Sequence, residues 1–380
     1  MFRPAIQRLS ILLFMCAFCM FLAIVSMHYK VVFKKDGYDY KINASRLMER
    51  SLQKIKKDDK EIDSSYDPLE TGVVYFKNGL EGNLDSKLTT LNPNFAGLVV
   101  DMFIKANLEE GDNIAVAFTG SMPGANLAVL SACEAMNIKP TIITSVSASN
   151  WGANDYGMSW LDMERKLSDY KYYRSDAASV GKGGDIGNGL SEKDIKAIIK
   201  SIDRNNISKI YNKKKNLDFH ISERMKLYDR DYEDIDLFVN VGGGVASIGY
   251  YPGIEKQSGF LSVDSIRFLY SNKVISDCVM KRFAYRKNNP VPSVNITNIE
   301  ALVGDDLPII SLAKDENNNP VFSKKNSPVI GKGPLFSEKR YNLVIVIPCL
   351  IASLTLVLGV GFYSHFQIKQ RMTSYDPDSF

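Results

Sequence analysis

Histidine and cysteine are scarce in this chain, which has 3 histidines and 5 cysteines among 380 residues. This count excludes a catalytic zinc held by several histidines, and no cysteine pair is followed by a second ligand cluster. A disulfide scaffold is excluded as well. Cys133 and Cys278 could form a single bridge, but two buried free thiols suit the apolar helical surroundings of Cys133 better. We expect no metal and no cofactor.

An excess of basic charge is also missing, since 47 Lys and Arg residues face 43 Asp and Glu residues and leave a net charge of +4. Dedicated nucleic-acid binders usually concentrate more positive charge, so we expect no nucleic-acid partner. The mild basicity still permits an anionic ligand. With 45% apolar and 24% charged residues, the chain has the composition of a folded protein with a sizeable core.

Long apolar runs are present only near the two ends. Residues 9–27 and 342–363 contain no charged residue, and each run is about long enough to cross a hydrocarbon core of roughly 30 Å. Arg3 and Arg8 precede the first run, as in a cleavable signal peptide, but no small-x-small cleavage site follows it. The sequence therefore predicts two transmembrane helices, the first of them an uncleaved anchor.

Two spans would place both termini on one side of the membrane and residues 28–340 on the other. Basic residues flank the spans on both sides and do not decide the orientation, but a short basic head before an apolar run favours cytoplasmic termini and an extracytoplasmic domain. Helix-like spacing in residues 43–58 predicts a spacer, with a basic helix lying on anionic lipid as the alternative. The predicted parts are a basic tail (1–8), a transmembrane helix (9–27), a juxtamembrane helical spacer (28–69), an α/β domain (70–310), a linker (311–340), a second transmembrane helix (341–363) and a C-terminal tail (364–380).

The body of the chain alternates between strand-like and helix-like segments. Residues 113–118 and 141–146 are predicted strands, and residues 125–137 between them are a predicted helix, which together make a βαβ unit. We expect an α/β fold with a mainly parallel sheet covered by helices on both faces. The further segments are predicted helices at 96–108, 191–205, 222–228, 274–283 and 298–303, a strand at 235–241 and an extended run at 291–296.

Ligands bind at the carboxyl ends of the strands in such sheets, and three segments leave those ends. The first, residues 119–126, is neither a Walker A loop nor a GxSxG motif. Gly120 and Gly124 would let the backbone approach an anion, with Asn126 beside them, and Ser121 could donate a hydrogen bond or, once activated, attack a carbonyl group. An ordinary tight turn is the alternative.

The second segment, residues 145–155, is a dense set of hydrogen-bonding side chains around one of only 2 tryptophans. Its predicted ligand-binding residues are Ser147, Ser149, Asn150, Trp151 and Asn154. A polar surface loop with the tryptophan in the core is the alternative.

The helix that follows carries two carboxylates that could supply acid-base chemistry. These are Asp162 and Glu164, although Asp162 and Arg165 could simply form a surface ion pair.

The third segment contains three successive glycines after a strand, and its predicted ligand-binding residues are Asn240, Gly242, Gly243 and Gly244. We expect Ser121, Ser149 and Asn240 to share one cleft. The glycine-rich residues 181–189, which include Asp185, are predicted to form a mobile surface loop.

Several strings in this body resemble a known family. The run GDNIAVAFTGSMPGANLAVLSACEAMNIKPTIITSVSASNWGAND, followed in order by WLDMER, RSDAAS, GLSEKD, ERMKLY, VNVGGGVASIG and MKRFA, is similar to the poly-gamma-glutamate system protein family over roughly residues 70–305. The resemblance implies a bacterial membrane protein that works with the subunits of the synthase of this anionic, capsule-type polymer. It also implies a histidine near residue 295, where this chain has Asn295.

Two functions remain open. One is an accessory protein whose α/β domain binds an anionic ligand, such as a polymer end, or a partner subunit. The other is a hydrolase or transferase that acts on the polymer through Ser121, with Asp162 or Glu164 as acid or base. A Ser-His-Asp triad would have to use His220, which has no evident reason to meet Ser121, so the enzyme hypothesis is the weaker one.

Overall fold

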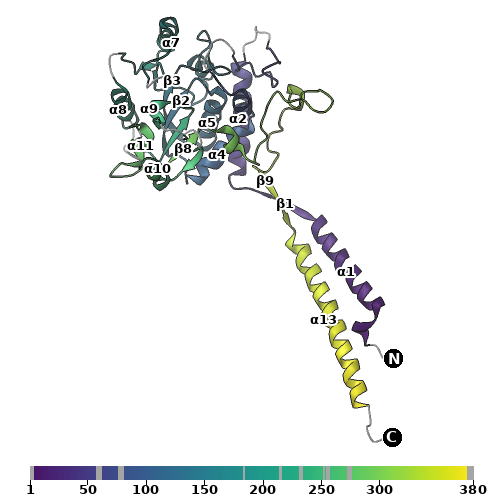
Figure 1. Cartoon of the computed structure of the whole chain (residues 1–380). Helices are drawn as coiled ribbons and strands as arrows, with labels where there is room; N and C mark the ends of the chain where they lie inside the picture. Colours follow the sequence, from purple (N-terminus) through teal and green to yellow (C-terminus); the bar gives the residue numbers. More distant parts are fainter. Residues whose placement is uncertain are drawn as a thin grey trace. The chain divides into compact units, whose positions relative to one another are not determined.

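The computed structural model describes residues 4–56, 62–75, 81–182, 185–213, 216–230, 234–250, 253, 257–271 and 276–374. They form two compact units (Figure 1). One unit contains the chain up to Lys34 and from Ser337 onward, and the other contains Lys35–Phe336. The predicted fold class applies to the second unit and the predicted spans to the first.

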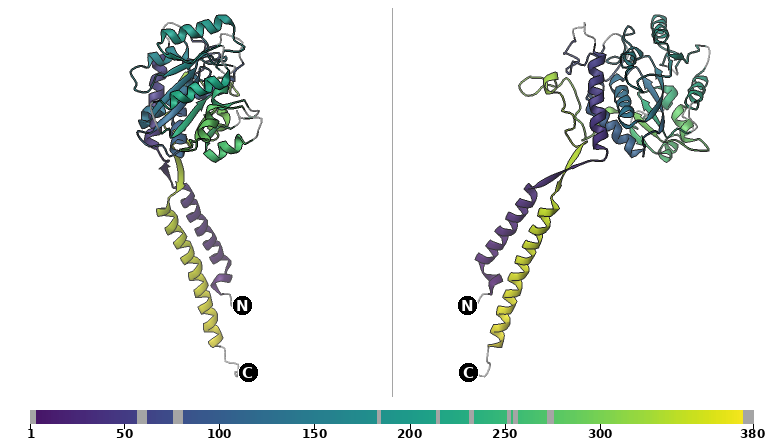
Figure 2. Two further views of the ribbon diagram at one scale, coloured as in Figure 1. Left: turned by 90° about the vertical axis from the view of Figure 1, so that its left-hand side faces the viewer. Right: turned by 180° about the vertical axis from the view of Figure 1, so that it is seen from behind.

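The first unit consists of two long helices and a short β-ribbon. Helices α1 (Leu9–His28) and α13 (Leu343–Thr373) run side by side in the views of Figure 2, and a 3-10 turn, η1 (Ala5–Gln7), precedes α1. The N–H of Ile6 donates to Ser364 Oγ at 2.9 Å. Strands β1 (Lys30–Lys34) and β9 (Ser337–Tyr341) pair antiparallel.

The side chains in the apolar stretches of α1 and α13 are not buried in the structure. By length and composition both helices can cross a membrane, which is compatible with a two-span membrane protein. The second helix is longer than predicted and continues to Thr373, ten residues beyond the expected end at 363.

A mainly parallel sheet forms the centre of the second unit. Its strand order is β5-β4-β3-β2-β6-β8-β7, and only β7 at the edge runs antiparallel to its neighbour. In chain order the strands are β2 (Asn113–Thr119), β3 (Lys139–Ser145), β4 (Ala177–Ser179), β5 (Ser208–Lys209), β6 (Leu237–Val241), β7 (Gly259–Leu261) and β8 (Ser293–Ile296).

Helices cover both faces of this sheet. Successive side chains of a strand point to opposite faces, and apolar side chains on both faces need to be covered. In β2, Ile114, Val116 and Phe118 belong to one apolar core, and Ala115 and Ala117 belong to the other. The first core contains residues of α2 (Tyr38–Ile55), α3 (Leu84–Thr90), α4 (Asn94–Lys105), α5 (Pro123–Met136), α6 (Trp160–Lys166), α7 (Glu192–Arg204) and α12 (Ile299–Val303). The second contains residues of α8 (Leu217–Tyr228), α9 (Val245–Ile248), α10 (Val263–Leu269) and α11 (Val279–Ala284). The predicted α/β fold is confirmed.

The α/β unit begins earlier than the sequence predicted. Helix α2 is not a spacer, because Ala44 and Met48 on its apolar face are completely buried in the core that also contains α4 and α5. Lys41 on the same helix is buried too, and its Nζ pairs with Asp101 at 2.5 Å. The helix itself was predicted, but its partner was not, since an amphipathic pattern does not say what covers its apolar face.

The predicted linker 311–340 also contributes to this unit. Leu335 and Phe336 are buried in the core, and Leu335 O accepts a hydrogen bond from Lys41 Nζ at 3.3 Å. The unit therefore extends to Phe336, and the remaining linker residues form part of β9.

The start of helix α11 differs from the prediction, and the state of two cysteines decides between the predicted alternatives. The helix predicted at 274–283 begins only at Val279, and residues 274–275 lie outside the described residues. Cys133 and Cys278 are both buried free thiols, so the single bridge does not form.

Candidate functional site

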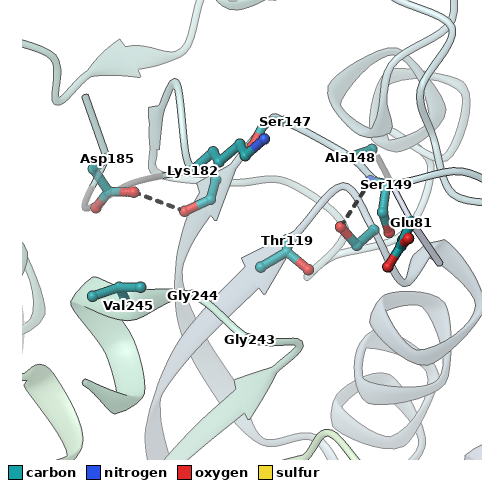
Figure 3. Close-up of a pocket in the computed structure, with 12 residues that line it drawn as sticks. Glu81, Thr119, Ser147, Ala148, Ser149, Lys182, Asp185, Gly243, Gly244 and Val245 are labelled. Carbon is teal, nitrogen blue, oxygen red and sulfur yellow. Dashed lines mark hydrogen bonds between the residues drawn. The ribbon is translucent and has the colours of Figure 1, made fainter. Parts of the chain in front are cut away.

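The site lies where the strand order of the sheet reverses. Strands β3 to β5 are added on one side of β2, whereas β6 pairs with its other side, so a crevice opens at the carboxyl ends of β2 and β6. A pocket of about 360 Å³ occupies this position (Figure 3). It is lined by Glu81, Thr119, Ser121, Ser145, Ser147, Ala148, Ser149, Lys182, Asp185, Gly243, Gly244 and Val245. Of the predicted site residues, the structure brings Ser121, Ser147, Ser149, Gly243 and Gly244 together here.

The turn after β2 requires glycines because other backbone segments of the protein pack closely against it. A Cβ atom at Gly120 would lie 2.5 Å from the carbonyl oxygen of Val146, and one at Gly124 would lie 2.6 Å from that of Thr90. Asn126 is buried and its Nδ2 donates to the carbonyl oxygen of Thr119 at 2.9 Å. These three residues shape the turn, and none of them lines the pocket, contrary to the ligand contacts predicted for them.

In the glycine loop after β6 (residues 242–244), some residues serve packing and others line the pocket. Gly242 has φ +86° and its missing Cβ makes room for Thr119 Oγ1, whereas Gly243 has open space where a Cβ would stand and faces the pocket. Asn240 is buried beneath the loop, and its Nδ2 donates to Gly242 O at 2.7 Å and to Asn295 Oδ1 at 2.8 Å. The amide of Asn295 thus helps to hold this loop.

The loop after β3 contributes its serines to the pocket. Its other predicted site residues contact other parts of the protein. Asn154 Nδ2 donates to Asn150 Oδ1 at 3.2 Å. Trp151, at φ +65°, packs against Tyr66 with ring centroids 5.4 Å apart. Asn150, Trp151 and Asn154 are not among the pocket-lining residues, so their predicted ligand contacts are not supported.

The two carboxylates predicted to serve Ser121 have other partners. Asp162 closes the N-terminal capping box of α6 with Ser159 and forms an ion pair with Arg204. Glu164 accepts a hydrogen bond from the N–H of Ser175 at 2.9 Å, and burial raises the pKa of Glu164 to about 7. Neither residue lines the pocket with Ser121. The expectation that they act on Ser121 is therefore wrong, because their oxygens hold α6 to α7 and to the segment before β4.

No Ser-His-Asp triad forms around Ser121 in the described part of the chain. His220 lies on α8 with its Nε2 3.3 Å from the carbonyl oxygen of Asn212, and it is not a pocket-lining residue. Ser121 Oγ instead accepts a hydrogen bond from the N–H of Ser149 at 3.1 Å.

A buried lysine that no sequence motif indicated lies beside the pocket. Lys87, in the last turn of α3, is only 4% exposed, and its Nζ lies 2.7 Å from Ser149 Oγ. Burial lowers the pKa of Lys87 to about 7. No carboxylate forms an ion pair with it among the described residues.

A buried ion pair forms the wall of the pocket near β3 and β4. Arg224 Nε donates to Asp185 Oδ2 at 2.7 Å, and the Arg224 guanidinium also donates to Ser145 and Ser179. Burial opposes the ionisation of Asp185, but the charge and hydrogen bonds of Arg224 outweigh it and hold the pKa of Asp185 below its usual value. The described part of residues 181–189 is thus not simply the surface loop that was predicted; residues 183–184 lie outside the described residues.

Within the described residues, no group of three or more His, Cys, Asp or Glu side chains is arranged to hold a metal ion. The pocket is lined by hydroxyl groups and a glycine loop, and the exposed side chain of Lys182 lies at it. The amine of Lys87 lies nearby. Comparison of the chain with protein-family models, curated proteins and solved structures gives no match.

Proposed function

We propose that this protein is a membrane-anchored accessory component of bacterial poly-gamma-glutamate synthesis or export, and that its α/β unit binds an anionic ligand, namely an end of the polymer. The family resemblance of residues 70–305 supports the pathway. It also supports synthase subunits as partners and capsule-type polymer as the product that they make.

The observation that carries the binding function is the composition of the pocket at the strand reversal. Ser121, Ser147 and Ser149 offer hydroxyl groups, and the Thr119 hydroxyl is buried without a hydrogen-bond partner in the described part of the chain. Arg224 compensates the charge of Asp185 from beneath, and the exposed Lys182 side chain brings a positive charge to a pocket whose other lining carboxylate is Glu81. Hydroxyl donors with one nearby cation suit a carboxylate.

The second candidate, a hydrolase or transferase with Ser121 as its nucleophile, has less support. A serine nucleophile needs a base within hydrogen-bond reach. The described partner of Ser121 Oγ is a backbone N–H, which cannot take a proton.

We further propose that the protein resides in the bacterial cell membrane with both termini in the cytoplasm and the α/β unit outside. Single cysteines introduced at the exposed positions Ser64 and Ser374 should then report opposite sides of the membrane. On intact cells an impermeant maleimide should label Ser64→Cys and not Ser374→Cys, with the parent chain as the background control. Labelling of both positions would refute the two-span topology, and the reverse pattern would refute only the orientation.

Ligand binding can be tested with the full chain in detergent and a synthetic oligomer of γ-linked glutamate. Gly243→Val places a side chain in open pocket space without the strain of a positive φ, and it should abolish binding while leaving thermal stability unchanged. Lys182→Gln should weaken binding roughly tenfold, because it removes one charged contact. The measurement is calorimetric titration at low salt.

The matched control is Lys200→Gln, which removes an exposed lysine of α7 that does not line the pocket. It should bind like the parent protein. Unchanged affinity in a well-folded Gly243→Val protein would contradict the proposed binding site.

A further inference from the structure

We propose that the pocket is an acyl-transfer centre in which Ser149 is the nucleophile and Lys87 is its general base, acting on the amide bonds of a carboxylate-bearing chain. The Ser149–Lys87 pair stands on its own geometry. The choice of a carboxylate-bearing polyamide as substrate rests on the proposed function.

The first step of the argument is the contact between the two side chains. Lys87 Nζ lies 2.7 Å from Ser149 Oγ, within the range that direct proton transfer requires. Ser149 is half-buried and lines the pocket, whereas Lys87 is buried and is not a lining residue. The nucleophile therefore faces the space where a substrate would lie, and the amine stands behind it.

The second step is the environment of the amine. A Cβ atom at Gly82 would lie 3.3 Å from Nζ of Lys87, so the backbone at this glycine packs closely over the amine. No described carboxylate is paired with it, and burial alone lowers the pKa of Lys87 to about 7. A lysine used only for stability would normally carry a paired charge, whereas a general base must be neutral near the operating pH.

The third step assigns a role to Ser121. Its Oγ accepts the N–H of Ser149 at 3.1 Å, which leaves the Ser121 proton free to point into the pocket. A hydroxyl at this place can donate to the carbonyl oxygen of a substrate held against Ser149, and this donation becomes stronger as that oxygen gains negative charge. The sequence left the roles of hydrogen-bond donor and nucleophile both open for Ser121, and this geometry favours the donor.

The reaction follows from these positions. Neutral Lys87 takes the proton of Ser149, and the Ser149 oxygen forms a bond to the amide carbon. The carbon–nitrogen bond then breaks while the Lys87 ammonium gives its proton to the leaving amine, so that an ester on Ser149 and a free amine remain. Water, deprotonated by Lys87, attacks the ester, and the bond between the acyl carbon and the Ser149 oxygen breaks. The Lys87 ammonium returns its proton to the Ser149 oxygen, and a carboxylic acid is released. Neither a metal nor a redox partner is needed for these steps.

The experiment uses a fluorophosphonate probe, which reacts with activated serines whatever the natural substrate is. The full chain in detergent should be labelled on Ser149, as located by mass spectrometry of the adduct. The labelling rate should rise as the pH increases through about 7, because Lys87 must lose its proton to act as a base.

Variants separate the roles of the individual residues. Ser149→Ala should abolish labelling, and Lys87→Met should slow it at least about a hundredfold and remove the pH dependence. Ser121→Ala should keep the label on Ser149 at a reduced rate. Ser168→Ala, a change of an exposed serine that does not line this pocket, is the matched control and should react like the parent protein. Thermal unfolding of each variant checks that it folds.

Absence of any adduct in the folded parent protein, an adduct on Ser121, or a parent-like rate in folded Lys87→Met would overturn the proposal. Because the probe carries no glutamate, its result is independent of the polymer. Normal labelling without binding of the glutamate oligomer would contradict the proposed function and leave the Ser149–Lys87 centre standing.

Discussion

Arg224→Met is expected to lower the free energy of unfolding by about 3 to 5 kcal/mol, because it leaves the buried carboxylate of Asp185 without its counter-charge. Arg224 is completely buried and also donates to Ser145 and Ser179, so water cannot take over its role without opening the core. Chemical denaturation of the full chain in detergent, followed by tryptophan fluorescence, would measure the change.

Two controls make the result specific to the ion pair. Arg165→Met removes an exposed arginine at 3.7 Å from Asp162 and should cost less than about 1 kcal/mol. Adding Asp185→Asn to Arg224→Met removes the uncompensated charge and should recover part of the stability. Equal costs for Arg224→Met and Arg165→Met would show that the pair does not contribute as described.

The same pair gives stability a defined pH dependence. The pKa of Asp185 is lower in the folded protein than in the unfolded chain, so its contribution is present above the unfolded pKa and is lost as the pH falls through the folded value. The loss of stability in acid should therefore be smaller in the double variant than in the parent protein.

Gly120→Val is expected to have the other large effect, a loss of about 3 kcal/mol or more. A Cβ atom at this position would lie 2.5 Å from Val146 O and 3.2 Å from the Cβ of Ala148, so the turn after β2 could not approach the loop after β3. The clash involves backbone atoms, which cannot rotate away as a side chain can. We expect little folded protein on size-exclusion chromatography.

Gly243→Val is the matched control, because it is the same substitution at a glycine of the loop after β6 with nothing within 4 Å of the added Cβ. It should fold normally. If both variants folded with parent-like stability, the close approach of the two loops described at Gly120 would be incorrect.

Much of the α/β fold could be predicted from local patterns in the sequence. The β-branched run that forms β3 and the glycine-flanked run that forms β2 are typical of buried parallel strands, and the helix between them follows from its spacing. Because parallel strands joined by helices end at one edge, the sequence predicted one cleft for Ser121, Ser149 and Asn240. The two serines do line one pocket, but Asn240 is buried beneath the glycine loop and does not line it.

The chemical partners of these residues could not be predicted. Ser149 meets Lys87 across 62 positions of sequence, and Asp185 meets Arg224 across 39. A lysine or arginine that will be buried looks like a surface residue in a single sequence, since burial depends on which elements pack over it. For the same reason Asp162 looked like a possible catalytic acid until Arg204 was found beside it.

The sequence by itself thus determined the two long apolar helices, the alternation of strands and helices and the edge of the sheet at which the pocket lies, since each depends on the order and type of neighbouring residues. Only the tertiary structure decided that α2 belongs to the core, that Gly120 and Gly124 serve packing, and that Ser149 lies against a buried amine. These are contacts between distant segments, and their energies arise from desolvation and close packing that exist only once the chain has folded.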